Sequence, residues 1–82
     1  MPYIKEADRE RLHQGAMPAT PGELNYMITF LIRTYMENTG GLSYTKANEI
    51  VGVLDCAKME FYRRVVFPYE QQKQYENGDV YA

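Results

Sequence analysis

The strongest constraint on the fold is a short helix-terminating run, Asn-Thr-Gly-Gly at residues 38–41, between the two longest segments with helical apolar spacing. Glycine readily adopts the left-handed conformation that ends many helices. Upstream, Thr20, Pro21 and Glu23 have the spacing of an N-cap, a proline at the first helical position and a capping box. The sequence therefore predicts a helix over about residues 21–38, with capping residues at its start and glycines that end it.

A second helix is predicted over about residues 44–67, with Ser43 or Thr45 as its cap. Pro68 lacks a backbone N–H and its ring clashes with the preceding turn, so it predicts a kink followed by a C-terminal extension. Asn77-Gly78 is expected to end that extension. Because the connection between the two long helices is short, they are expected to form an antiparallel hairpin.

The N-terminal arm differs in composition from the hairpin. Residues 5–13 are rich in helix formers and charge, which predicts a short, mostly solvated helix. Glycine and proline then predict a linker over residues 14–20. With the hairpin and its extension over residues 21–76, we expect one all-α domain that spans residues 1–82.

Both long helices have apolar sectors wider than one neighbouring helix needs. A chain of 82 residues buries only roughly 60% of its unfolded surface and needs a further source of stability. A single cysteine, Cys56, excludes an intrachain disulfide, and with His13 as the single histidine the sequence argues against a structural zinc site. We therefore expect a homo-oligomer. The expected core residues are Leu24, Met27, Ile28, Leu31, Ile32 and Tyr35 in the first helix, and Ala47, Ile50, Val51, Leu54, Ala57, Phe61 and Val65 in the second.

The charge and motif content argue against several classes of function. A net charge of −2 is unlike the basic proteins that bind long nucleic acids. The sequence has no signal peptide and no apolar run of membrane-spanning length, which predicts a cytoplasmic protein. Cys56 is expected to be a small buried hydrophobic residue and His13 to lie at a helix C-terminus, so no nucleophile–base pair is indicated. We expect no enzyme activity, no cofactor and no metal.

The segment of residues 60–70 combines arginines with aromatic side chains. Arginine can bind phosphate oxygens through two N–H groups, and tyrosine can stack on a base. An alternative interpretation is an ordinary packed helix, with Phe61 and Val65 buried and with Glu60 and Arg64 forming an i,i+4 pair in solvent. The predicted ligand-binding residues are Tyr62, Arg63, Arg64 and Tyr69.

A second polar set lies in the first long helix, where Asn25, Thr29 and Arg33 are spaced four residues apart. That spacing places the three side chains along one helix face. They are candidate ligand-binding residues that line a groove between subunits. The alternative is a solvated helix face with no ligand.

Several short sequence segments, spread over nearly the whole chain, resemble those of a family of small phage and prophage proteins. The segments are MPYI at the start, PGELNY at 21–26, GLSY at 41–44, EFYRRVV at 60–66, PYE at 68–70 and ENGDVY at 76–81. The resemblance implies a viral or prophage setting, and hence the cytoplasm of a bacterial host. It implies no particular reaction.

In size and expected shape the chain is also similar to phage sponge proteins, which oligomerise and sequester the cyclic oligonucleotide signals of CBASS immunity. A shared architecture does not fix function, so two functions stay open. The first is an anti-defence homo-oligomer that binds an anionic, cyclic-nucleotide-like signal between subunits. The second is a protein-interaction module, such as a phage inhibitor, adaptor or virion accessory protein, whose apolar helix faces bind a host or phage protein.

Overall fold

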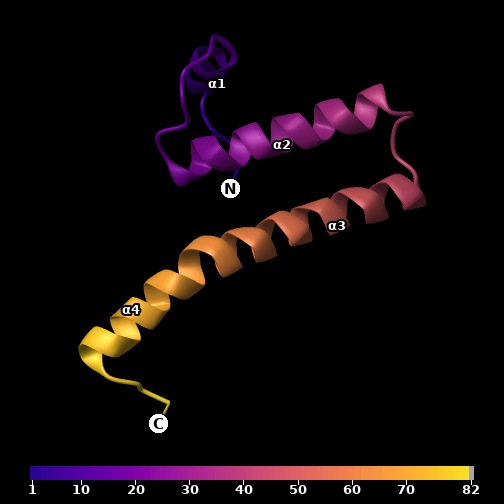
Figure 1. Cartoon of the computed structure of the whole chain (residues 1–82). Coiled ribbons are helices and arrows are strands. Elements are labelled where there is room, and N and C mark those ends of the chain that lie inside the picture. The colour runs from indigo at the N-terminus through magenta and orange to yellow at the C-terminus, as the bar shows by residue number, and fades with distance from the viewer. Residues whose placement is uncertain (82) are drawn as a thin grey trace. The chain divides into compact units, whose positions relative to one another are not determined.

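The computed structural model describes residues 1–81, which form helices and turns and no strand (Figure 1). This confirms the all-α class. The chain divides into two compact units, Met1–Lys46 and Ala47–Ala82, which are described in turn. The hairpin pairing and the single domain over residues 1–82 stay predictions. The elements are α1 (Glu6–His13), α2 (Pro21–Asn38), α3 (Tyr44–Phe61), the π-helical turn η1 (Tyr62–Val66) and α4 (Phe67–Asn77).

Helix α2 begins where its capping residues predict. The Thr20 hydroxyl oxygen accepts a hydrogen bond from the Glu23 N–H at 3.1 Å, and Pro21 opens the helix. The Glu23 carboxylate reaches back and accepts from the Ala19 N–H at 3.0 Å. In a standard capping box this second bond goes to the cap residue itself, so here the box extends one residue further upstream.

The glycines after α2 end the helix as predicted. Gly40 and Gly41 have φ values of 103° and 82°, a region that side chains larger than glycine rarely adopt. The Gly41 N–H donates to the Met36 carbonyl at 2.9 Å, which satisfies one of the free carbonyls of the last turn. Of the two candidate caps for the next helix, Ser43 is the one used, because its hydroxyl accepts from the Lys46 N–H at 3.0 Å.

In the first unit, the N-terminal arm packs against α2. Leu12 in α1 is 3% exposed, and it is the one buried apolar residue in the described part of the chain. The first residues also lie close to α2, since a Cβ built on Gly22 would be 3.3 Å from Ile4 Cγ2 and 3.4 Å from the Met1 carbonyl. The arm helix is mostly exposed, as predicted, and Leu12 is the exception, because it is buried where α1 meets α2.

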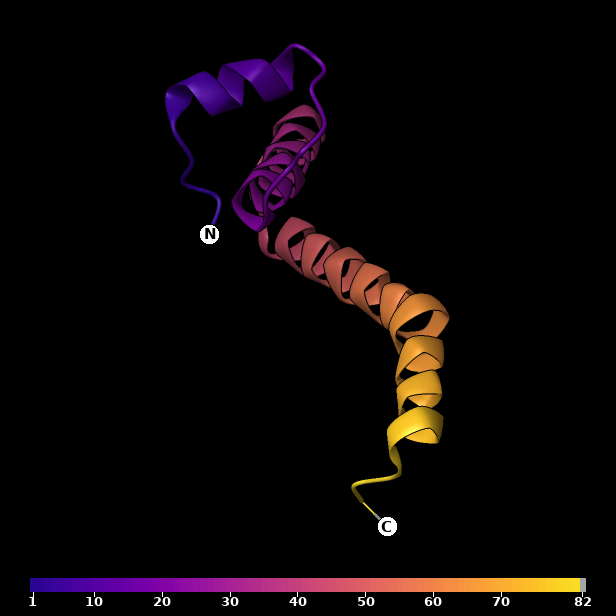
Figure 2. The ribbon, with the colours of Figure 1, turned by 90° about the vertical axis from the view of Figure 1, so that its left-hand side faces the viewer.

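In the second unit, α3 from Ala47 onward, η1 and α4 form one continuous bent helix (Figure 2). The predicted helix over residues 44–67 is interrupted at Tyr62, and helical structure continues through Pro68 to Asn77. The bend predicted at Pro68 is thus spread over the π-helical turn that precedes the proline. An α-helical Pro68 would present its ring to the Arg64 carbonyl, and a wider π-turn moves that carbonyl away.

None of the described residues of the second unit is buried. Leu54 is 40% exposed, Phe61 60% and Val65 53%, although all three were predicted core residues. Cys56 is also exposed, so its predicted burial was wrong. A single bent helix has no second layer to cover its apolar side chains. In the first unit, the predicted core residues Leu24, Ile28, Leu31 and Tyr35 are exposed as well.

Candidate functional site

The π-turn changes which side chains meet around the predicted ligand residues. In a regular α-helix, Tyr69 would lie on the same face as Tyr62, two turns away. A π-turn takes about one more residue per turn, so Glu70 is brought toward Tyr62 instead. The Tyr62 hydroxyl donates to the two Glu70 carboxylate oxygens, at 3.3 and 3.2 Å. The Glu70 charge, and then this hydrogen bond, raise the pKa of Tyr62.

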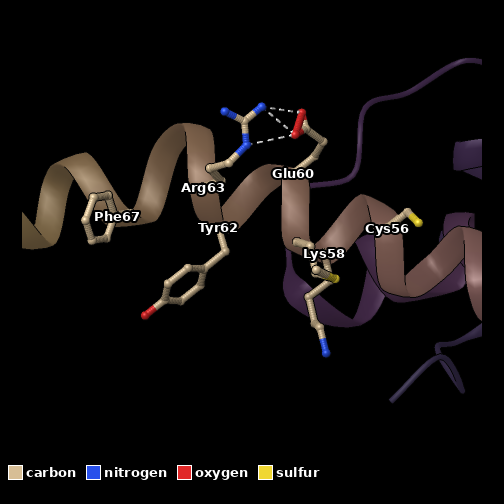
Figure 3. A pocket seen from close by; sticks show the side chains of 7 residues that line it. Cys56, Lys58, Glu60, Tyr62, Arg63 and Phe67 are labelled. Atoms are coloured by element: carbon tan, nitrogen blue, oxygen red, sulfur yellow. Dashed lines mark hydrogen bonds and ion pairs between the residues drawn. The ribbon is translucent and has the colours of Figure 1, made fainter.

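Arg63 is held by Glu60, one turn before it. Its Nη2 lies 2.7 Å from Glu60 Oε1 and its Nε lies 3.1 Å from the same oxygen (Figure 3). The predicted pair of Glu60 with Arg64 was therefore wrong. Glu60 pairs with the arginine three residues after it and not with the one four residues after it. Both partners of the Glu60–Arg63 pair are more than half exposed, so the pair adds little stability.

Arg64 makes no hydrogen bond or ion pair with any described residue, and in this it differs from the other four arginines. An exposed guanidinium without a partner is available to an external anion. The other arginines bind oxygens at these distances: Arg9 to the Ile4 carbonyl at 2.8 Å, Arg11 to Glu23 at 2.8 Å, Arg33 to Glu37 at 3.3 Å and Arg63 to Glu60 at 2.7 Å.

An open hollow of ≈ 930 Å³ lies along the end of α3 and the π-turn. Tyr62 and Arg63 line it, whereas the predicted ligand residues Arg64 and Tyr69 do not. The side chains of Tyr62 and Arg63 point to opposite sides of the helix (Figure 3). Tyr69 instead has the Lys73 ammonium 5.6 Å from its ring centre. The remaining lining residues, which give the hollow a mostly apolar surface, are Cys56, Lys58, Met59, Glu60 and Phe67.

The second predicted set lies on α2 in the first unit. The Thr29 hydroxyl donates to the Asn25 side-chain oxygen at 3.3 Å, and Arg33 pairs with Glu37, four residues later, at 3.3 Å. These polar groups thus have partners on their own helix, as expected for a solvated face. The groove between subunits stays a prediction.

A ring cluster that the sequence did not predict joins α1 to α2. His13 Nε2 lies 2.6 Å from the Tyr26 hydroxyl oxygen, and the His13 ring meets Phe30 edge-on with 4.4 Å between ring centres. The available signal was the i,i+4 spacing of Tyr26 and Phe30 off the main apolar stripe. Two aromatic residues on one side of a helix need a partner, and the last turn of α1 supplies it.

Beside the ring cluster, an ion pair links the same two helices. Arg11 Nη2 lies 2.8 Å from Glu23 Oε1, and the Glu23 side chain is only 9% exposed. The Ala19 N–H and the Arg11 guanidinium both lower the pKa of Glu23, the first more strongly. The hydrogen bond to Glu23 in turn raises the pKa of Arg11. Glu23 thus both caps α2 and anchors the arm.

In the described part of the chain, no group of three or more His, Cys, Asp or Glu side chains is placed to hold a metal ion. None of the described helices is both long and apolar enough to span a membrane. The resemblance to small phage proteins stays a prediction.

No curated protein and no solved structure is detectably similar to the chain. A family model described as a domain of unknown function, DUF6899, matches residues 1–80. Since this match covers almost the whole sequence, the chain belongs to the DUF6899 family.

Proposed function

We propose that the protein is a non-enzymatic helical binding module that acts as a homo-oligomer, with the second unit as its docking surface. One observation carries the proposal: no described residue between 47 and 81 is buried, although this unit contains many apolar side chains. Folded monomers rarely leave a long contiguous apolar face uncovered. The face is called here the apolar strip, and it consists of Ala47, Ile50, Leu54, Ala57, Phe61 and Val65.

The strip has the chemistry of a helix-docking surface. Leu54, Phe61 and Val65 are each about half exposed, so covering them stabilises a complex by about 1 kcal/mol per side chain. In a symmetric contact, the same side chain is covered in both copies, so each residue of the strip contributes this stabilisation twice. Asp55 and Lys58 pair with each other at 3.0 Å, so neither brings an unpaired charge to the contact.

Sedimentation velocity tests this proposal at micromolar concentration. We expect the wild-type chain to sediment as a dimer or a larger oligomer. Phe61→Asp places a charge in the strip and should give monomers with unchanged helix content by circular dichroism. Tyr75→Asp is the matched control, because Tyr75 is 91% exposed and lies outside the strip. A wild-type chain that is monomeric at this concentration would rule the proposal out.

A second candidate function is binding of a small anion such as a cyclic nucleotide, as in a phage anti-defence sponge. The observation that favours it is the unpaired Arg64, which follows Arg63 directly in the sequence and Tyr62 by two positions. Arg63 is neutralised by Glu60, so a bound phosphate would have to displace that carboxylate.

Thermal-shift measurements with cyclic di- and trinucleotides test this candidate. We expect a ligand-induced rise in melting temperature that Arg64→Gln abolishes. Glu60→Gln should enlarge the rise, because it frees Arg63 for the ligand. Lys5→Gln removes a cation from the first unit and serves as a control. If no cyclic nucleotide raises the melting temperature, or if Arg64→Gln leaves the rise intact, this candidate fails.

A further inference from the structure

We propose that the partner on the apolar strip is a second copy of this chain docked antiparallel, around a two-fold axis that passes between Leu54 and Ala57. The inference rests on the proposed function, because it names the occupant and the arrangement of the same surface. Three features of the second unit support it, namely the spacing of the strip, the sizes of its residues and the position of the π-turn.

The spacing of the strip reads the same in both directions. Its residues from Ala47 to Phe61 follow one another at steps of three, four, three and four, which is the spacing of a coiled-coil seam. Between Ile50 and Phe61 the steps are four, three and four, which is symmetric about a point between Leu54 and Ala57. A reversed copy therefore presents the same pattern, as a two-fold contact requires.

Residue size favours the antiparallel arrangement over the parallel one. About this axis, Leu54 faces Ala57 of the second copy. Ala47 faces the position that the extra residue of the π-turn gives to Val65, so each small residue meets a larger one. A parallel pairing would place Ala57 opposite Ala57 and Phe61 opposite Phe61. That arrangement leaves a gap in one layer and crowds another, whereas well-packed interfaces alternate large and small residues.

The π-turn keeps the strip apolar at its C-terminal end. In an uninterrupted α-helix, the position three residues after Phe61 would bring Arg64 onto the seam. Because η1 takes about one more residue per turn, Val65 occupies that position and Arg64 is rotated off it. The turn thus removes a cation from the predicted contact.

The available area indicates a modest affinity. Five apolar side chains on or beside the strip are 40–68% exposed: Val51, Val53, Leu54, Phe61 and Val65. At roughly 100 Å² each, they offer about 500 Å² per copy, below the ≈ 800 Å² per partner of a standard interface. Association in the micromolar range is therefore the expected strength.

Disulfide trapping tests the arrangement in chains that carry Cys56→Ala. In the antiparallel dimer, Ile50 faces Phe61 of the second copy. Two Ile50 residues, or two Phe61 residues, lie about 16 Å apart along the axis, from eleven residues at about 1.5 Å rise. A disulfide needs Cα atoms within about 7 Å. An equimolar mixture of Ile50→Cys and Phe61→Cys chains should form a cross-linked dimer on oxidation, and neither chain alone should.

The outcomes separate this inference from the proposed function. If each variant cross-links with itself, the copies are parallel, which overturns the inference and leaves the oligomer intact. If the wild-type chain is dimeric but no combination cross-links, another surface is used and the inference fails. If the chain is monomeric by sedimentation, the proposed function and the inference fail together. The wild-type chain is the further control, because Cys56 lies about 160° around the helix from Leu54 and should not cross-link in the proposed dimer.

Discussion

The Phe67 N–H donates a hydrogen bond to the carbonyl oxygen of Tyr62, five residues before it. This π-type bond immediately precedes Pro68, which has no N–H to give to the Arg64 carbonyl and whose ring would contact that carbonyl in an α-helix. The wider turn lets the helix pass the proline without ending. We infer that the proline is the cause of the π-turn and that the displacement of Arg64 is its consequence.

Replacing the proline should restore an α-helical turn. We expect Pro68→Ala to remove the Phe67–Tyr62 bond and to increase the free energy of unfolding by about 1–3 kcal/mol. NMR amide shifts across residues 62–68 and urea denaturation measure the two effects. Pro21→Ala is the matched control, because a proline at the first position of α2 lacks only an N–H that has no helical acceptor. A π-turn that persists in Pro68→Ala would show that another residue causes it.

The burial of the Leu12 side chain should be required for α1 to stay helical. Eight residues are too few for a stable isolated helix, so α1 depends on its packing against α2. We expect Leu12→Ala to cost about 2–3 kcal/mol in the docking of the arm, toward the low end for a buried leucine. Hydrogen exchange should then show lost protection of the α1 amides while the middle of α2 stays protected.

The control for this experiment is Leu42→Ala, since Leu42 is 76% exposed. Its effect should stay within about 0.5 kcal/mol. Equal loss of protection in α1 and α2 would contradict the expectation, because it would mean that the arm and α2 unfold as one unit.

The helix ends could be predicted from the sequence because they depend on contacts between near neighbours. Thr20 and Ser43 accept backbone hydrogen bonds from residues three positions later, and Gly40 adopts the positive φ that its type allows. Each of these signals lies within one turn of the residue that it affects. The bounds of α2 were therefore predicted correctly at Pro21 and Asn38.

Burial and side-chain pairing were harder to predict, because they depend on contacts across the fold or on an irregular turn. The docking of α1 depends on Arg11, Leu12 and His13, which look like parts of a solvated helix until α2 is placed beside them. The predicted Glu60–Arg64 pair was wrong because Glu60 binds Arg63 instead, and spacing alone does not choose between partners three and four residues away. Apolar spacing identified the strip but not what covers it.

Acid should weaken the attachment of the arm through Glu23. Its pKa in the folded chain is lowered from the ordinary value of 4.5, so the folded state favours the ionised form. The stabilisation is therefore complete above that value and is lost as the pH falls through the lower folded-state pKa. We expect hydrogen-exchange protection of α1 to decrease below about pH 4.5. Glu23→Gln should weaken the arm at neutral pH and remove this acid dependence.

Glu37→Gln provides the matched control for Glu23. Glu37 pairs with Arg33 on the same helix, but both side chains are more than half exposed. An exposed pair of this kind contributes little to stability. The α1 amides should keep the wild-type acid dependence in this variant. If Glu37→Gln and Glu23→Gln act alike, the change reflects net charge and not the Arg11–Glu23 contact.

The Tyr62–Glu70 contact should raise the pKa of Tyr62, so that its hydroxyl ionises at a higher pH. The Glu70 charge disfavours a second negative charge beside it and raises the pKa of Tyr62 above its ordinary value of 10.0. Because the folded-state pKa is raised, the stabilisation is present below the unfolded pKa and is lost as the pH rises through the folded one. NMR titration of ring-labelled tyrosine should show Glu70→Gln lowering the pKa of Tyr62. Glu76→Gln, which removes an equal charge that pairs with Lys73, should leave it raised, and equal shifts in both variants would refute the direct contact.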